Sequence, residues 1–334
     1  MSFSRYAAAF ASPNGPGDAR PTALDIISDE GLFGQLHDKV MLVTGCSSGL
    51  GIETARALSA TGARVYCTAR DLQKGREALA DILEPGRVEL MDLKLDSFKS
   101  VRAFAKEFLC RSKTLNVLVC NAGIMFPPHT KTEDGFESQF ATNHLGHFLL
   151  FNLLKEALLA GASPSFSSRV VIVSSMGHRG GGIHFDDVNL ENDYTPNKGY
   201  CQSKTANIYM ANEIERRYGS RGLHALSLHP GGIGTGLQVH INPKLLEQWA
   251  SNEDLIKRTS SPAQGAATQV LAAVGKEFEG KGAKYLEQCS ESGPVKDGYT
   301  LMDRGYETWA FDKEKEQRLW IESLKMVALN ETDA

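Results

Sequence analysis

The chain has 334 residues, of which 42% are hydrophobic and 23% are charged, and its formal net charge is -4. These values are typical of a globular protein with a sizeable core, and the slightly acidic balance argues against a nucleic-acid-binding protein, which would usually have a basic face or tail. No apolar run approaches the roughly 20 residues needed to span a bilayer, so we expect a soluble protein with neither a membrane span nor a nucleic-acid partner.

The cysteine and histidine pattern favours a reducing, cytoplasmic environment and no metal site. None of the six cysteines belongs to a C-x-x-C pair, and most lie in apolar segments, as reduced thiols of intracellular proteins do. His144 and His147 form an H-x-x-H pair, but no cysteine or carboxylate pattern completes a ligand set. Both are therefore expected to be structural.

Residues 1–37 are expected to form a flexible N-terminal extension. The segment before Thr22 is small, polar and rich in proline and glycine, without the apolar stretch of a secretory signal. No acidic residue precedes Asp18, as in transit peptides, but a disordered tail is the preferred interpretation. Residues 22–36 follow with the pattern of a short amphipathic helix.

From residue 39 onward, strand-like segments alternate with helix-like ones. Strands are expected at 39–45, 63–70, 88–93, 115–123, 169–175, 223–231 and 283–288, and helices at 50–62, 71–83, 97–111, 137–161 and 199–219. This alternation requires crossover connections, so the strands should be parallel. The sequence therefore predicts one α/β domain over 38–290: a Rossmann-type, doubly wound parallel sheet of about seven strands with helices on both faces. Residues 232–261 are expected to form a lid-like segment, and 291–334 a C-terminal extension with a helix.

The first strand runs into a glycine-rich turn, TGCSSGLG, at residues 44–51. Glycines between a strand and a helix allow a tight turn and a close approach to phosphate, and the helix N-terminus offers free N–H groups. Because the turn stands between a predicted strand and a predicted helix, it indicates a dinucleotide site. No G-K-[ST] follows, so it is not a P-loop.

The residues after the second strand bear on the choice of cofactor. A dinucleotide site often places an acid about 20 residues after the glycine turn, where it binds the ribose 2′-hydroxyl. Here the strand ends at Arg70, and Asp71 comes one residue later. An arginine can pair bidentately with a 2′-phosphate, so the sequence favours NADP; NAD, with Asp71 on the ribose, is the less favoured alternative.

An ordered series of motifs resembles the short-chain dehydrogenase/reductases. The series is TGCSSGLG, CNAG at 120–123, Asn143 in ATNHLGHF, IVSSMG, YCQSK and HPGG. The resemblance covers about 40–290 and is greatest to the retinol dehydrogenase and WW-domain oxidoreductase branch, although no WW domain or membrane anchor is recognised. One departure is Cys120, where the family usually has asparagine.

The resemblance implies four catalytic residues. Tyr200 would be the acid–base residue, and Lys204 would bind the nicotinamide ribose and lower the pKa of Tyr200. Ser175 would hydrogen-bond the substrate oxygen, with Ser174 as the neighbour that could be confused with it, and Asn143 would belong to a proton relay. Residues i and i+4 share a helix face, so the Tyr200–Lys204 spacing suits these roles.

The resemblance also implies the cofactor contacts. Besides Tyr200 and Lys204, the residues expected to border the dinucleotide are Gly45, Ser47, Ser48, Leu50, Gly51, Arg70, Asp92, Leu93, Asn121, Gly123, Ile233 and Thr235.

The expected function is an NADP-dependent alcohol dehydrogenase or carbonyl reductase that interconverts an alcohol and its ketone or aldehyde on an apolar small molecule. A tailoring step in secondary metabolism is one expectation, and a non-catalytic NADP-binding regulator is the alternative. His178 and Arg179, and also Met125 and Phe126, are candidate walls of the substrate pocket. The family often uses the helix at 137–161 as a dimer face, so a homodimer is kept open.

Overall fold

A parallel β-sheet organises the structure, which is a computed structural model that describes residues 5–300 and 302–330. Seven parallel strands run in the order β3-β2-β1-β4-β5-β6-β7, and an eighth strand, β8, pairs antiparallel with β7. The strands are β1 (Val40–Val43), β2 (Arg64–Ala69), β3 (Val88–Asp92), β4 (Val117–Cys120), β5 (Ser168–Val173), β6 (Leu223–His229), β7 (Lys284–Glu287) and β8 (Ser290–Glu291).

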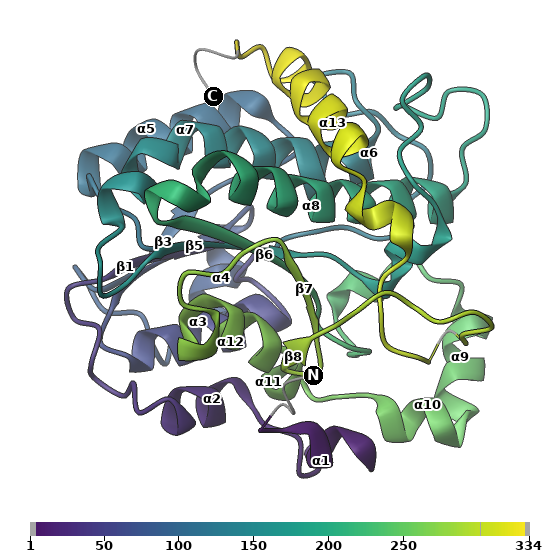
Figure 1. The fold of residues 1–334 in the computed structure, drawn as a ribbon, viewed down its shortest axis with the longest axis horizontal. Coiled ribbons are helices and arrows are strands. Elements are labelled where there is room, and N and C mark those ends of the chain that lie inside the picture. The colour runs from purple at the N-terminus through teal and green to yellow at the C-terminus, as the bar shows by residue number, and fades with distance from the viewer. Residues whose placement is uncertain (1–4, 301, 331–334) are drawn as a thin grey trace.

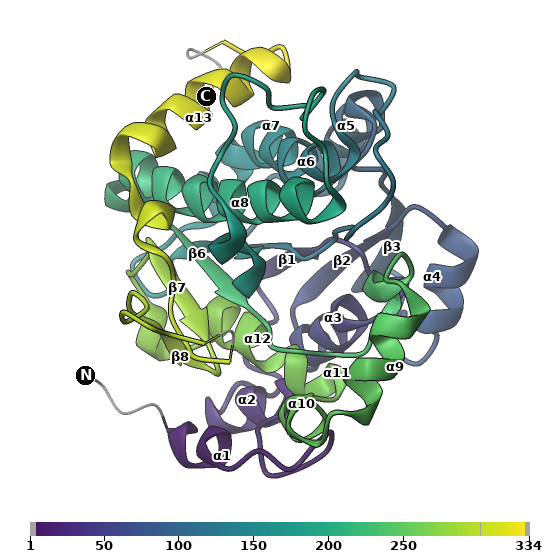
Figure 2. The ribbon, with the colours of Figure 1, turned by 90° about the vertical axis from the view of Figure 1, so that its right-hand side faces the viewer.

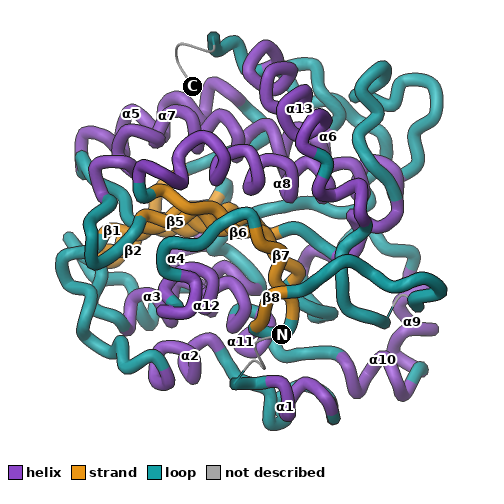
Figure 3. The backbone as a smooth tube through the Cα atoms, viewed as in Figure 1, coloured by secondary structure: helices purple, strands orange, loops and turns teal. Residues whose placement is uncertain are grey.

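Helices cover both faces of this sheet, which confirms the doubly wound α/β fold (Figures 1 and 3). Every residue of β1, β4 and β5 is buried, because a sheet covered on both faces has no solvated side. In Figure 1 the upper layer contains α5 (Phe98–Arg111), α7 (Gly146–Gly161) and α8 (Pro196–Tyr218), and the lower layer contains α2 (Ala23–Asp29), α3 (Leu50–Ala60) and α12 (Ala267–Val274). The shorter or terminal helices are α1 (Ala7–Ala11), α4 (Leu72–Ala78), α6 (Ser138–Phe140), α9 (Pro243–Ser251), α10 (Glu253–Arg258), α11 (Pro262–Gly265) and α13 (Lys313–Met326).

The eighth strand is an addition to the expected sheet of about seven. It returns from β7 through Gln288 and Cys289, both with φ of 52°. Two consecutive positive φ values are typical of a tight hairpin turn, which usually carries Asn-Gly or Asp-Gly. Gln-Cys lacks that signal, so the hairpin was not predicted.

The strand order places the reversal of the fold between β1 and β4, which are neighbours. In open α/β sheets, ligands bind outside the carboxyl ends of the strands at such a reversal. The glycine-rich turn follows β1, and the CNAG segment follows β4. The topology therefore brings these two motifs together at one edge of the sheet.

The N-terminal extension contributes to the core through α2. Helix α2 begins with a capping box, in which the side chains of Thr22 and Asp25 each accept a hydrogen bond from the other residue's backbone N–H. Its residues Ile26 and Ile27 are fully buried in the lower core. The short amphipathic helix expected within residues 22–36 is thus present as α2, and its apolar face extends the core.

The C-terminal extension carries the expected helix, α13, which lies across α7 and α8 (Figures 1 and 2). Its Trp320 is 2% exposed and packs edge-on to Phe148, with ring centroids 4.8 Å apart, and to Phe151. This helix covers part of the surface considered for a dimer. The homodimer remains a prediction.

The segment expected to be a lid, 232–261, forms mainly α9 and α10. Neither helix contains a buried residue, and both lie at one side of the protein, on the right in Figure 1. The lid-like role of this segment stays a prediction. Over the described ranges, every helix falls short of the length and apolar character that a transmembrane span requires.

Candidate active site

The glycine-rich turn has the geometry that the sequence predicts. Gly45 has φ of 75°, and a Cβ there would lie 2.8 Å from the Cβ of Ala122. A Cβ at Gly51 would collide with the carbonyl oxygen of Gly45 and lie 2.8 Å from Asn121 Nδ2. Gly49 has φ of 64° and precedes the first residue of α3. The glycines therefore allow the turn to fold against the segment after β4, with the N-terminus of α3 behind it.

A buried hydrogen-bond network joins the two motifs. Thr44 Oγ1 accepts from the backbone N–H groups of Asn121 and Ala122, each at 3.0 Å, and lies 2.9 Å from His147 Nε2. Asn121 Nδ2 in turn donates to the Thr44 carbonyl at 2.8 Å. The Asn121 amide thus holds the turn in place. The roles of Thr44 and His147 were not predicted, because only the fold brings them within reach.

The two histidines of the H-x-x-H pair point to different partners. His147 reaches Thr44, whereas His144 Nε2 lies 2.9 Å from Ser323 Oγ of α13. Among the described residues, no group of three histidine, cysteine or carboxylate side chains is arranged to hold a metal ion. Both histidines serve structural contacts.

Tyr200 and Lys204 project from the same face of α8, as their spacing predicts. The Lys204 Nζ lies 5.5 Å from the centroid of the Tyr200 ring and donates a hydrogen bond to the carbonyl of Val173, at the end of β5, at 3.1 Å. Tyr200 is 6% exposed and Lys204 is 3% exposed. A phenol and an ammonium group therefore lie together at the carboxyl edge of the sheet.

Burial dominates the ionisation of both groups. It raises the pKa of Tyr200 to about 12, despite the opposing effect of the neighbouring Ser175 hydroxyl. It lowers the pKa of Lys204 to about 8. The direction for Tyr200 is opposite to the lowering expected from Lys204 alone, because desolvation penalises the phenolate.

The two serines after β5 have different surroundings. Ser174 is 2% exposed, and its hydroxyl donates to the backbone carbonyl of Lys204 at 2.7 Å. The Ser175 hydroxyl accepts from the N–H of Gly177 at 3.0 Å and lies next to the Tyr200 phenol. This favours Ser175 over Ser174 as the residue that faces a substrate oxygen.

Asn143 lies in a π-helical turn, Ala141–Leu145, at the start of α7. Such turns are rare and occur frequently at functional sites. The Asn143 side chain accepts from Ile124 N at 2.8 Å and donates to Ile124 O at 3.0 Å and Ser203 Oγ at 2.9 Å. A Cβ at Gly123 would lie 3.1 Å from Asn143 Oδ1 and 3.6 Å from Lys204 Nζ. Asn143 therefore holds the segment after β4 against Lys204.

The residues at the ends of β2 and β3 differ in exposure and in hydrogen bonding, and so in whether they are free to bind a cofactor. Arg70 is exposed. Asp71 is the N-cap of α4, and its carboxylate accepts from Lys74 N at 3.0 Å. Asp92, at the end of the neighbouring β3, is exposed, and Leu93 is buried next to it. Arg70 and Asp92 lie on neighbouring strand ends, whereas Asp71 already has a structural task.

The segment after β6 lies over the glycine turn. A Cβ at Gly49 would lie 3.3 Å from Thr235 Cγ2, and one at Gly265 would lie 2.6 Å from Ile233 Cγ1 and 2.8 Å from Leu50 Cδ2. In the turn itself, Ser47 and Leu50 are partly exposed and Ser48 is exposed. These residues share one end of the sheet with the turn and with Lys204.

The candidate walls of the substrate pocket differ from one another. Phe126 packs edge-on to Tyr200, with ring centroids 5.3 Å apart, and Met125 is partly exposed beside it. His178 and Arg179 are buried: Arg179 donates to Gly305 O at 2.6 Å, and Trp309 Nε1 donates to His178 O at 3.3 Å. The segment after Ser175 is therefore held by the C-terminal extension, and Phe126 is the better-placed apolar wall.

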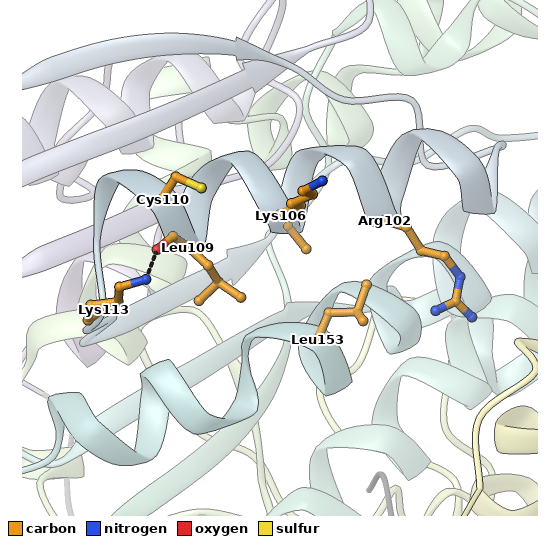
Figure 4. A pocket seen from close by; sticks show the side chains of 7 residues that line it. Arg102, Lys106, Leu109, Cys110, Lys113 and Leu153 are labelled. Carbon is orange, nitrogen blue, oxygen red and sulfur yellow. Dashed lines mark hydrogen bonds between the residues drawn. The ribbon is translucent and has the colours of Figure 1, made fainter.

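A shallow groove of about 390 Å³ lies on a different face, between α5 and α7 (Figure 4). It is lined by Arg102, Ala105, Lys106, Leu109, Cys110, Lys113 and Leu153. None of the predicted site residues borders it. The candidate site is therefore defined by the side chains at the carboxyl edge.

Comparison with known proteins agrees with these observations. Residues 39–246 match the family model described as short chain dehydrogenase. The chain is 58% identical over 327 residues to the short-chain dehydrogenase/reductase prx1 of Penicillium roqueforti, covering 98% of this chain and 96% of the relative. It is 38% identical over 312 residues to human retinol dehydrogenase 14, covering 89% of this chain and 88% of the relative.

Among solved structures, the fold resembles that of an uncharacterised protein from Mycobacterium paratuberculosis. The TM-score is 0.65 at 34% sequence identity, over 87% of this chain and 94% of that one. Sequence, sheet topology and the arrangement at the carboxyl edge thus agree, and the chain belongs to the short-chain dehydrogenase/reductase family of oxidoreductases.

Proposed function

We propose that the chain is an NADP-dependent carbonyl reductase or alcohol dehydrogenase that acts on an apolar small molecule. The observation that carries this proposal is the pairing of buried Tyr200 and Lys204 at the carboxyl edge of the sheet, with Ser175 beside the phenol. A protein that only sensed the dinucleotide would have no need of this acid–base arrangement.

The cradle formed by the glycine turn fits a nicotinamide dinucleotide. Side chains at Gly45 or Gly51 would fill the space against Ala122 and Asn121, and the N-terminus of α3 favours a pyrophosphate. When bound, the dinucleotide supplies or accepts the hydride. Ser47, Ser48 and Leu50 would border the pyrophosphate in this arrangement, and Asp92, Leu93, Asn121 and Gly123 would border the adenosine.

The chain's own groups would handle the proton. In the reducing direction, the carbonyl carbon gains the hydride and the Tyr200 hydroxyl gives its proton to the carbonyl oxygen, which leaves a phenolate. Ser175 would hold that oxygen by a hydrogen bond. Protonated Lys204 would stabilise the phenolate and bind the nicotinamide ribose, and Ile233 and Thr235 would border the carboxamide. A relay role for Asn143 rests on the family resemblance.

The preference for NADP rests on Arg70. Its guanidinium is exposed at the end of β2, whereas the Asp71 carboxylate caps α4. A 2′-phosphate is bound well by a planar, permanently charged arginine. The apolar character of the substrate rests on Phe126 next to Tyr200.

The proposal extends to the location and the pathway of the enzyme. A cytoplasmic enzyme would keep the six cysteines reduced. A tailoring step in secondary metabolism rests on the family resemblance alone.

The test is binding and turnover with both reduced cofactors. We expect NADPH to bind more tightly than NADH and to be consumed with a panel of apolar ketones and aldehydes. Binding of NADPH with no reduction of any carbonyl, together with no oxidation of any alcohol in the presence of NADP, would favour the non-catalytic alternative. Failure to bind either dinucleotide would contradict the proposal as a whole.

A further inference from the structure

The side chain of Arg20 is buried although it belongs to the N-terminal extension. It is 5% exposed. Its Nε donates to Asp18 Oδ1 at 2.8 Å, and its two terminal nitrogens donate to Ser260 Oγ at 3.0 Å and to four backbone carbonyls. The carbonyls belong to Gly15 (3.0 Å), Lys257 (3.4 Å), Arg258 (2.8 Å) and Thr259 (2.7 Å).

Three of these carbonyls are consecutive and lie at the end of α10. The last carbonyls of a helix have no partner within the helix, and the helix dipole makes that end attractive to a cation. The guanidinium of Arg20, from a distant part of the sequence, supplies both the hydrogen-bond donors for these carbonyls and the positive charge. The Arg20 side chain therefore fixes the C-terminal end of the lid-like segment 232–261 in place.

Further hydrogen bonds hold the extension in the same place. Gly15 N donates to Lys257 O at 2.8 Å, and Gly17 N donates to Gln264 Oε1 at 2.9 Å. The Gln264 amide donates to the carbonyls of Asp18 at 3.2 Å and Arg20 at 3.1 Å. The loop 13–21 is thus fixed to residues on both sides of Ser260, which lies at the end of the lid-like segment.

The same residue is connected to the cofactor segment. Ser260 N donates to Gly232 O at 2.9 Å, and Ile233 pairs with Ser260 in a parallel bridge. Ile233 in turn lies against Gly265, as does Leu50 of the glycine turn. A continuous series of contacts therefore runs from Arg20 through Ser260 to Ile233.

We propose that Arg20 is a positioning residue, which holds the downstream end of the lid-like segment and thereby keeps Ile233 and Thr235 over the glycine turn. The N-terminal extension would then form part of the cofactor site although it contains none of the expected cofactor contacts. The effect on the cofactor rests on the proposed function, whereas the hold on the lid-like segment does not.

The test compares Arg20→Ala with Arg5→Ala. Arg5 belongs to the same extension, but its guanidinium is largely exposed, donates to Asp29 O at 3.1 Å, and, among the residues that the structure describes, interacts with neither the lid-like segment nor Ser260. For each variant, the rate of tryptic cleavage at Lys244 in α9 and the dissociation constant of NADPH are measured on the full chain. Trp249, also in α9, provides a fluorescence signal.

For Arg20→Ala we expect faster cleavage at Lys244 and an NADPH dissociation constant about tenfold higher, because a small displacement of positioning groups has a large effect on a site. Arg5→Ala should resemble the unchanged chain in both measurements. The fluorescence of Trp249 should also change in Arg20→Ala without NADPH.

Other results would separate the two parts of the argument. Unchanged cleavage and unchanged NADPH affinity in a folded Arg20→Ala protein would overturn the proposal. If the unmodified chain bound no dinucleotide, the proposed function would be contradicted. Faster cleavage of Arg20→Ala in that case would still support the hold on the lid-like segment.

A second variant addresses a failure of Arg20→Ala to fold. Arg20→Lys retains the charge but cannot donate to all the carbonyls at once. It should give intermediate cleavage and affinity. If Arg20→Lys had the same cleavage rate and the same NADPH dissociation constant as the unmodified chain, the role of the guanidinium would be contradicted.

Discussion

At the scale of single residues, the candidate site depends on a conflict between charge and burial. Tyr200 and Lys204 are both nearly excluded from water, so each is shifted toward its neutral form. The consequence for Tyr200 is a pKa of about 12, and for Lys204 a pKa of about 8. Tyr200 is therefore protonated at neutral pH and suited to donate a proton to a developing alkoxide.

Replacing Tyr200 with phenylalanine tests this role. Tyr200→Phe keeps the ring that packs against Phe126 and removes only the hydroxyl. We expect turnover to fall by about a hundredfold to ten-thousandfold, the usual contribution of acid–base catalysis, while the NADPH dissociation constant changes little. Steady-state kinetics and fluorescence titration measure the two quantities. Substantial residual turnover would exclude Tyr200 as the proton donor.

The lowered pKa of Lys204 predicts how cofactor binding depends on pH. The ammonium form is present below about pH 8 and is lost as the pH rises through that value. Because the charged form would bind the ribose and attract the anionic dinucleotide, NADPH affinity should fall across this range. Titrations in buffers on either side of pH 8 measure the effect, and Lys204→Met should remove it. A flat profile in the unmodified chain would contradict the assignment.

Cofactor preference depends on the single side chain of Arg70. Arg70→Asp should shift the ratio of the NADPH and NADH dissociation constants by about tenfold to a hundredfold in favour of NADH. A change of this size corresponds to the loss of charge-assisted hydrogen bonds to the 2′-phosphate. Arg64→Asp is the matched control, since Arg64 is an exposed arginine at the opposite end of β2. If both variants shifted the ratio equally, the effect would be one of net charge.

At the scale of secondary-structure elements, α13 behaves as part of the core. Trp320 and Leu324 are buried in the same cluster as Phe148 of α7 and Ile214 of α8. The guanidinium of Arg217 lies 4.8 Å from the Trp320 ring centre. The helix therefore stabilises the layer that carries Tyr200 and Lys204.

Trp320→Ala measures this contribution. Removing a buried tryptophan typically lowers the free energy of unfolding by about 3–5 kcal/mol. Gln317→Ala, an exposed position on the same helix, should change it by about 0.5 kcal/mol or less. Denaturant unfolding of both variants compares them. A loss below about 1 kcal/mol for Trp320→Ala would show that α13 docks without stabilising the domain.

At the scale of the whole molecule, both extensions belong to the folded unit. The N-terminal one buries Ile26 and Ile27 and connects to the lid-like segment through Arg20. Loss of each buried isoleucine side chain costs about 2–5 kcal/mol, a large part of the roughly 5–15 kcal/mol by which proteins are stable.

Deletion of residues 1–37 should therefore lower the unfolding midpoint strongly or prevent folding. Deletion of residues 1–12 is the control, because α1 contains no buried residue, and it should have a much smaller effect. Thermal unfolding followed by circular dichroism distinguishes the two. Equal midpoints for the two deletions would show that residues 13–37 add no stability.

Local sequence patterns predicted much of the fold. The apolar runs of β1, β4 and β5 and the helical spacing of α5 and α8 are visible in short windows, so the parallel sheet and its helix layers could be predicted. The turn between β7 and β8 could not, since Gln288 and Cys289 adopt positive φ values that their residue types do not indicate.

By itself, the sequence determined the parallel sheet, the glycine-rich turn and the shared face of Tyr200 and Lys204, because each depends on residues close together in the chain. Only the tertiary structure decided which groups are buried from solvent, and this burial sets the direction in which the pKa of Tyr200 shifts. It also decided that Thr44 meets His147 and that Arg20 meets the end of α10. Such contacts join residues far apart in sequence, and no local periodicity or motif encodes them.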